Sequence, residues 1–302
     1  MAQTNQFKNI LRGMRIIRRR YIDIIFIVLA VICGLAAVYL DAQLTYVASA
    51  NTEWVEIKSL KPGVSQWYIE AADIRISCDG ERKEFSGRLR IQSPVIIHIK
   101  RISWGPMEIS IKSETGSEDQ IVAKLHNDET DEDIFAEGCL FITINNLIER
   151  AKKGKTIVLA VDGYMEISRE VRHETMRSIP VLKSGKVQVV GKTIIGDEIY
   201  DAETIILSTG DHFSVDNPGA GKGLIVADQQ PGLTAVSFTL GKVAHIRRYG
   251  TQGYKVGSSL WVRFENDPVI KALIAAVFFI LGALAAWRRW WKESNGKEKS
   301  NN

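Results

Sequence analysis

The sequence predicts a mainly β extracytoplasmic domain, sandwich or barrel-like with one short helix, flanked by two transmembrane α-helices. Two apolar runs, residues 21–40 and 267–287, stand near the two ends of a chain of 302 residues. Between them, apolar and polar residues alternate with a period of two, as in strands that bury one face. Turn-forming residues separate these short runs, which is typical of a sandwich or a barrel.

Residues 21–40 are predicted to form the first transmembrane helix. No charged residue lies between Ile24 and Leu40, and a helix of about 20 apolar residues crosses a hydrocarbon core of roughly 30 Å. Positive charge beside a spanning helix favours the cytoplasmic side. The predicted interface anchors at this end are Arg18, Arg19, Arg20 and Tyr21. The N-terminus is therefore expected inside the cell and residue 41 outside.

The preceding segment, residues 1–20, has apolar residues at helical spacing with basic residues between them. This pattern predicts a basic amphipathic helix on the cytoplasmic face of the membrane. The alternative is a solvated basic tail. Cleavage after Ala48-Ser49-Ala50 is a further alternative, but the apolar run is longer than that of a usual signal peptide.

The chain is predicted to return through the membrane at residues 267–287. An aromatic and basic cluster follows this run, and its charge places the C-terminal end inside. The anchors of this cluster are Trp287, Arg288, Arg289, Trp290 and Trp291. The tail, residues 288–302, is expected in the cytoplasm. The whole pattern predicts a two-pass inner-membrane protein with both termini cytoplasmic and a periplasmic central domain.

Both predicted spans carry small residues four positions apart, a spacing that lets helices approach closely in lipid. These residues are Ala30 and Gly34 in the first span, and Ala272, Ala276, Gly282 and Ala286 in the second. They predict packing between the two helices or against a partner, as a homo-oligomer or with other membrane or envelope proteins. The alternative is that Ala and Gly are simply common in membrane helices.

Residues 41–266 are predicted to form the β-rich region, either as one domain or as two subdomains divided near 177–186. Asp162-Gly163 between two strand-like runs predicts a type I′ hairpin. A short helix is expected at 147–153, with Asn145 or Asn146 as its cap and Gly154 after it. Strands are also expected over 88–91, 95–102, 107–111, 139–144, 156–161, 164–168, 187–190, 223–227, 233–240, 243–247 and 260–264.

Cys78 and Cys139 both lie in the predicted outer region, and Cys33 lies in the first span. An oxidising compartment permits a bridge between the outer two. The spacing alone does not show that they meet, so two buried thiols are an equal alternative.

The sequence contains no motif for a catalytic, cofactor or metal site. Residues 217–224 lack the spacing of a phosphate-binding loop, and the acidic stretch 127–133 lacks the glycine and distal glutamate of a calcium loop. Asp211, His212 and Ser214 are residue types of a catalytic relay, but neighbours along a strand point to opposite faces, so this spacing does not form one. No cofactor is expected. A catalytic site whose residues converge only in space is the alternative.

Charge is distributed unevenly along the chain. The predicted ends hold twelve basic and four acidic residues, which leaves 27 basic and 31 acidic residues in 41–266. The basic ends therefore favour anionic lipid headgroups as a partner, and nucleic acid is not expected.

These observations predict a membrane-anchored, non-enzymatic envelope subunit whose outer domain binds a protein or polymer and whose helices join a membrane complex. One alternative is a polymer-export or chain-length co-polymerase component, because those families resemble this chain in having two helices around one periplasmic domain. Their outer domains are rich in long helices, whereas this one is strand-like. The second alternative is an extracytoplasmic hydrolase.

Overall fold

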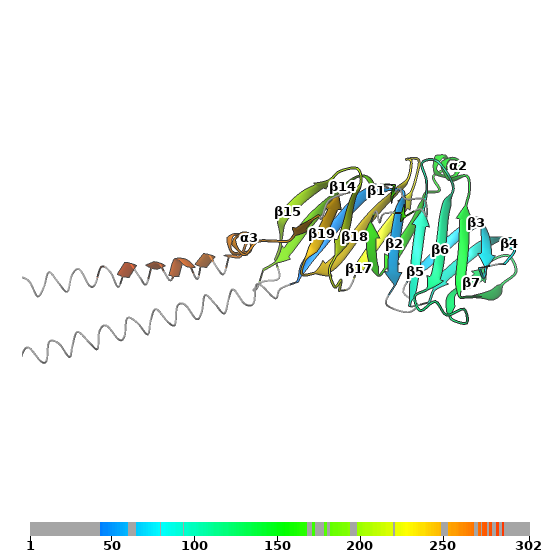
Figure 1. Ribbon diagram of the computed structural model, residues 1–302, viewed down its shortest axis with the longest axis horizontal. Helices are drawn as coiled ribbons and strands as arrows, with labels where there is room; N and C mark the ends of the chain where they lie inside the picture. Colours follow the sequence, from blue (N-terminus) through cyan, green and yellow to red (C-terminus); the bar gives the residue numbers. More distant parts are fainter. Residues whose placement is uncertain are drawn as a thin grey trace, which may run out of the picture. The chain divides into compact units, whose positions relative to one another are not determined.

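The computed structural model describes residues 43–59, 65–78, 80–92, 94–167, 171–172, 178–179, 182–193, 198–219, 221–248 and 253–268, and separate residues between 271 and 286. The described chain has twenty strands and two short helices, so the mainly β prediction is confirmed. All of the strands lie in one compact unit, residues 43–192 and 199–258 (Figure 1). The pairing of every described strand is antiparallel.

The smaller of the two main sheets has six strands. In spatial order they are β10 (Ile157–Asp162), β17 (Gly221–Ala227), β18 (Leu233–Gly241), β1 (Leu44–Thr52), β14 (Leu182–Lys192) and β15 (Ile199–Leu207). The first strand in the sequence, β1, lies at the centre, between β18 and β14. Segments from both halves of the chain are therefore needed to build this sheet.

The larger sheet has twelve strands. In order they are β20 (Tyr254–Val256), β19 (Ala244–Arg248), β16 (Asp211–Val215), β11 (Tyr164–Ile167), β2 (Trp54–Ser59), β5 (Val95–Lys100), β6 (Met107–Ser113), β9 (Cys139–Ile144), β3 (Gln66–Ile76), β4 (Arg82–Ile91), β7 (Ile121–Asn127) and β8 (Glu132–Glu137). A separate pair joins β12 (Val171–Arg172) to β13 (Ser178–Ile179).

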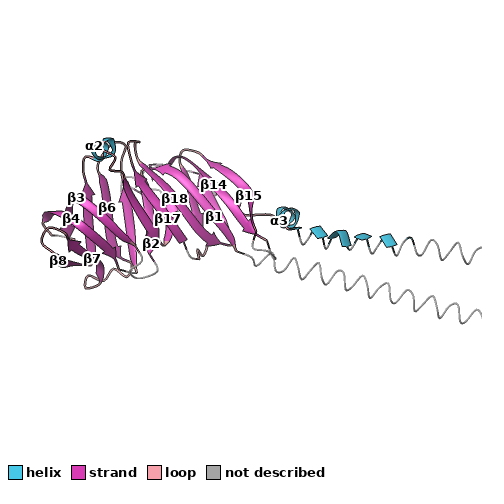
Figure 2. Cartoon of the chain, turned by 180° about the vertical axis from the view of Figure 1, so that it is seen from behind, coloured by secondary structure: helices cyan, strands magenta, loops and turns pink. Residues whose placement is uncertain are grey.

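The alternating strands bury one face and expose the other. On β1, Leu44, Tyr46, Ala48 and Ala50 are buried, while the residues between them are half-buried. The two sheets come together where β11 lies against β17 and β18. The larger sheet also folds back on itself, because β7 contacts β6 and β9 as well as pairing with β4. Figure 2 shows how strands make up nearly all of this unit.

The predicted hairpin at Asp162-Gly163 is wrong. The strand before it, β10, belongs to the smaller sheet, whereas β11 after it belongs to the larger one. The Gly163 amide donates to the Gly221 carbonyl and so continues the pairing of β10 with β17. The chain changes sheets here because Leu159 and Val161 are buried on one side of the corner and Tyr164 and Met165 on the other.

Two further stretches have turn-like or loop-like sequences but lie wholly or partly in strands. Lys183-Ser184-Gly185 resembles a turn, but it lies inside β14. Gly185 is required there by close packing, since a Cβ atom would lie 2.8 Å from the Ser49 carbonyl oxygen of β1. Likewise, residues 221–224 of the glycine-rich stretch 217–224 form the beginning of β17.

The predicted strand at 260–264 is a helix, α3 (Leu260–Asn266). Leu260, Val262 and Phe264 alternate as in a strand, but a capping residue precedes them. The Val262 amide donates to the Ser259 hydroxyl at 3.2 Å, which is the bond expected of a helix N-cap. This side-chain cap accounts for the helix where periodicity alone predicted a strand.

The predicted helix at 147–153 is present as α2 (Leu147–Lys152). Asn146 occupies the N-cap position with a φ of 55°, but its side chain makes no capping hydrogen bond. Gly154 follows with a φ of +76°, as predicted for the residue that ends a helix. The location of this helix was therefore predictable, whereas its capping mechanism was not.

Within the residues that the structure describes, no helix has both the length and the apolar character needed to cross a membrane. The predicted span 21–40 lies outside those residues. Only some positions of the predicted span 267–287 are described, and those between 271 and 286 are helical.

A buried arginine joins the two sheets. Arg101, which directly follows β5, is fully buried, and its Nη1 atom donates to the carbonyl oxygens of Asp228, Gln230 and Gly232 at 2.9–3.0 Å. These three residues belong to the connection between β17 and β18. The Arg101 amide donates to the carbonyl of Glu53, the residue between β1 and β2. Burial lowers the pKa of Arg101, and the nearby Asp228 opposes this effect.

We predict that Arg101→Ala lowers the free energy of unfolding by about 3 kcal/mol or more, because buried carbonyl oxygens lose their donor. Urea unfolding of the detergent-solubilised chain, followed by tryptophan fluorescence, measures this change. Arg90→Ala removes an exposed arginine of β4 and should change the free energy by less than about 0.5 kcal/mol. Equal stability of the two variants would contradict the structural role of Arg101.

Candidate functional site

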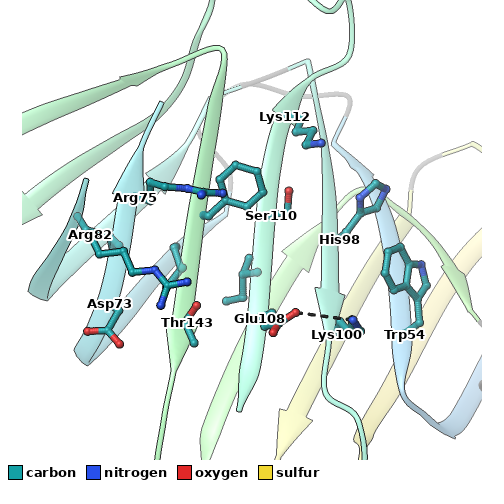
Figure 3. A pocket seen from close by; sticks show the side chains of 14 residues that line it. Trp54, Asp73, Arg75, Arg82, His98, Lys100, Glu108, Ser110, Lys112 and Thr143 are labelled. Carbon is teal, nitrogen blue, oxygen red and sulfur yellow. Dashed lines mark ion pairs between the residues drawn. The ribbon is translucent and has the colours of Figure 1, made fainter. Parts of the chain in front are cut away.

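The outward face of the larger sheet carries a cavity of about 410 Å³, here called the basic cavity. It lies across β2, β5, β6, β9 and β3, with one residue from β4 (Figure 3). Its lining residues are Trp54, Asp73, Ile74, Arg75, Arg82, His98, Lys100, Glu108, Ile109, Ser110, Lys112, Phe141, Ile142 and Thr143. Most of these side chains alternate with the buried residues of their own strands.

Strand register arranges the polar side chains of the cavity in two adjacent rows. One row runs Arg75, Phe141, Ser110 and His98 from β3 to β5 and continues on β2 to Glu56, which is buried and does not line the cavity. The next row runs Asp73, Thr143, Glu108, Lys100 and Trp54 across the same strands. Neighbours within a row come from adjacent strands, which lie about 4.8 Å apart. Residues separated by up to 89 positions in the sequence therefore form one continuous surface.

The cavity has an excess of positive charge. Lys100 is 3.8 Å from Glu108, and His98 Nε2 is 3.4 Å from the buried carboxylate of Glu56. In contrast, Arg75, Arg82 and Lys112 form no ion pair with any residue that the structure describes. These three cations therefore have no ion-pair partner among the described residues, although the cavity also contains the carboxylate of Asp73, which accepts a hydrogen bond from Asn145 Nδ2 at 3.0 Å.

Aromatic rings hold two of these cationic side chains in place. The Arg75 guanidinium carbon lies 4.4 Å from the centroid of the Phe141 ring, and Lys112 Nζ lies 5.7 Å from it. Both distances are within the range of cation–π attraction. At the other end of the cavity, the rings of Trp54 and His98 have centroids 5.0 Å apart. Figure 3 shows Arg75 toward one end of the basic cavity, and Trp54 with His98 at the other end.

The cavity also contains polar atoms without partners. Trp54 Nε1, Arg75 Nε and Ser110 Oγ are buried and make no hydrogen bond to any described residue. Buried polar groups are normally hydrogen-bonded, so such atoms call for an explanation. Among the described residues, the other buried polar atoms without a partner belong to Asn51 and Arg101.

An exposed apolar tip lies next to the basic cavity. The turn after β5 presents Ile102 and Trp104, which are 55% and 53% exposed. A smaller cavity beneath this turn is lined by Lys100 and Glu108, which also line the basic cavity. The two cavities are therefore adjacent and have these two lining residues in common.

The structure separates the residues whose types resemble a catalytic relay. Asp211 is buried and bonded to Arg248 Nε at 2.9 Å, whereas His212 Nε2 lies 2.8 Å from Glu166. Burial raises the pKa of Asp211, but hydrogen bonds from Arg248 and the Ser208 amide outweigh that effect, so its pKa is lowered overall. The ion pair links β16 to β19, and the hydrogen bond from the Ser208 amide to the Asp211 carboxylate holds the turn between β15 and β16.

The acidic stretch 127–133 spans the end of β7, the exposed turn at 128–131 and the beginning of β8. A hydrogen bond from Lys124 lowers the pKa of Asp133, and a second from His126 adds to this effect. No cluster of three metal-ligating side chains occurs among the described residues.

Of the predicted membrane residues, Ala30, Gly34, the arginines at 18–20, Tyr21 and the cluster 287–291 lie outside the described residues. Ala272, Ala276, Gly282 and Ala286 are described, helical and exposed. A Cβ atom added to Gly282 would meet no atom within 4 Å. The helix-packing and anchoring roles stay predictions.

Comparison with known proteins gave no assignment: no protein-family model, no curated protein and no solved structure matches this chain.

Cys78 and Cys139 form a disulfide in the structure, with their Cα atoms 5.7 Å apart. Cys139 begins β9, and Cys78 follows β3, so the bridge ties together the ends of two neighbouring strands that line the basic cavity. A covalent link here limits the relative movement of Arg75 and Phe141.

We predict that Cys78 and Cys139 resist alkylation in the denatured, non-reduced protein, while Cys33 reacts. Modification of all three cysteines without reductant would show that the bridge is absent. Closing a loop between residues 61 apart stabilises a fold by about 4 kcal/mol in the chain-entropy model. Replacing both cysteines with serine should therefore lower the urea midpoint, whereas Cys33→Ser, the matched control, should leave it unchanged.

Proposed function

We propose that this chain is a membrane-anchored, non-enzymatic envelope subunit whose extracytoplasmic β domain binds a partner through the basic cavity. The observation that carries this proposal is the group of three cations, Arg75, Arg82 and Lys112, without carboxylate partners among the described residues. Cations that serve only the fold are usually solvated singly or paired. A cavity that gathers them beside aromatic rings has the composition of a recognition surface.

The cavity lies on strands and is supported by rigid neighbours. Its polar side chains alternate along their strands with buried Ile97, Ile109 and Ile142, which are at most 1% exposed. Sites on packed strands hold their side chains more accurately than sites on loops. This arrangement supports binding by a preformed surface rather than by a loop that orders around its ligand.

The membrane part of the proposal rests on the sequence. The two apolar runs and their basic flanks support a two-pass inner-membrane topology in which residues 41–266 lie in the periplasm. The small residues of those runs support assembly with other membrane proteins or with further copies of the chain. The outer domain would then present the basic cavity to envelope components.

We predict that a photoreactive amino acid at Lys112 of the full chain crosslinks to a second component in intact cells. Lys186 on β14 provides the matched control, because it is also an exposed lysine on a strand but lies in the smaller sheet. Protease added to spheroplasts should remove the crosslinked product if the domain lies outside. Absence of a product at Lys112, or equal products at both positions, would refute the proposal.

A second candidate, an extracytoplasmic hydrolase, is favoured by one observation. Ser110 pairs across the strands with His98, which in turn pairs with Glu56. These are the residue types of a nucleophile, a base and an orienting carboxylate. However, Ser110 Oγ makes no hydrogen bond to His98, so the serine is not activated in this arrangement.

An esterase assay separates this candidate from the binding function. The hydrolase candidate predicts that the purified full chain cleaves a p-nitrophenyl ester and that Ser110→Ala removes at least about 99% of the rate, as for loss of a nucleophile. Thr143→Ala, which changes another hydroxyl of the cavity, should retain the rate. A wild-type rate equal to that of buffer would eliminate the hydrolase candidate.

A further inference from the structure

We infer that the basic cavity binds an acidic oligosaccharide. The inference rests on the proposed function, namely that the cavity is a binding surface, and adds the chemical class of the ligand. Arg75 and Arg82 supply the first element of recognition. A guanidinium presents paired N–H donors that match the oxygens of a carboxylate or a sulfate. Since neither arginine is neutralised by a described carboxylate, each is available to an acid group of the ligand.

The cavity also contains hydrogen-bond acceptors, which distinguish a sugar from a simple polyanion. Asp73 and Glu108 lie on either side of Thr143 in the same cross-strand row. Carboxylates accept hydrogen bonds and repel closely spaced phosphates. A sugar ring carries hydroxyl groups that can donate to these carboxylates while its acid group contacts an arginine. A mixture of donors and acceptors therefore fits a hydroxylated anion better than a nucleic acid.

Aromatic side chains supply the third element. Trp54 lies at one end of the cavity, Phe141 lies toward the other, and Trp104 projects from the adjoining turn. The C–H face of a sugar ring is apolar and packs on aromatic surfaces of this kind, while the rim of hydroxyls remains available for hydrogen bonds.

The dimensions of the site indicate an extended ligand. From β2 to β3 the cavity crosses four strand-to-strand steps, or about 19 Å along the sheet at the usual spacing of 4.8 Å, and Arg82 of β4 adds one further residue. Cations and aromatic rings recur along this distance rather than converging on one point. A single sugar or a small anion would leave most of them unused. The arrangement therefore fits several linked sugar units lying across the strands.

Binding of defined oligosaccharides to the full chain in a nonionic detergent tests this inference. Alginate oligosaccharides provide carboxylates, and dextran sulfate oligosaccharides provide sulfates. Cello-oligosaccharides of equal length are the neutral control, and poly-L-glutamate is a carboxylate polymer without sugar. We expect one of the two acidic glycans to bind, with an affinity that falls as salt rises, and to bind at least about tenfold more tightly than either control.

A matched pair of variants locates the binding. Arg82→Ala should weaken the acidic glycan by about tenfold or more, as for loss of a charge-assisted hydrogen bond. Arg90→Ala removes an exposed arginine from the same strand outside the cavity and should leave binding unchanged. Arg75→Lys keeps the charge but loses the paired donors, so it should also weaken binding. Thermal unfolding of each variant checks that its fold is intact.

Several results would overturn the inference: equal binding of cello-oligosaccharides or poly-L-glutamate, equal loss in the Arg82 and Arg90 variants, or no binding of either acidic glycan. The crosslinking experiment at Lys112 distinguishes failure of the proposed ligand class from failure of the proposed function. A crosslinked component without glycan binding would retain the proposed function and reject the ligand class. Absence of both would reject the two together.

Discussion

The buried guanidinium of Arg101 is the constraint on which the joining of the two sheets depends. Its Nη1 atom satisfies three carbonyl oxygens of the connection between β17 and β18, while its amide bonds to the carbonyl of Glu53. Glu53 is the corner at which the chain leaves β1 in one sheet and enters β2 in the other. The Glu53 side chain accepts a bond from the Ser103 amide, so both ends of the corner are fixed.

This corner also determines the geometry of the candidate site. Trp54 directly follows Glu53, and Lys100 directly precedes Arg101, so the same bonds place two residues of the basic cavity opposite each other. At the far side, the disulfide joins the ends of β3 and β9, from which Arg75 and Phe141 project. The cavity is thus held at both sides by interactions that lie outside it. Preorganisation of this kind reduces the entropy lost when a ligand binds.

Local sequence pattern predicts only part of this structure. Alternation correctly located β5, β6, β9 and β18, because each has one wholly buried face. It could not assign a strand to a sheet, which is why Asp162-Gly163 resembled a hairpin although the strands on its two sides belong to different sheets. The error at α3 arose differently: the Ser259 cap was visible in the sequence, but an alternating apolar pattern outweighed it.

The basic cavity could not be predicted for a related reason. Arg75 meets Phe141 only because β3 pairs with β9, and Ser110 meets His98 only because β6 pairs with β5. Each outward residue, considered along its own strand, is an ordinary solvent-facing side chain. The functional signal arises from cross-strand register, since that register gathers three cations that form no ion pair with a described residue.

The net charge of residues 41–266 indicates which kind of contact must select the ligand at this site. Residues 41–266 carry four more acidic than basic residues, so the basic cavity is a local reversal on a surface of opposite average sign. Long-range attraction toward a polyanion is therefore weak, and selection must come from contacts within the Debye length of about 8 Å. Such a surface favours ligands that also satisfy the carboxylates and aromatic rings at the same place. Tethering to a membrane, as proposed, would compensate for modest affinity by raising the local concentration of sites along a polymer.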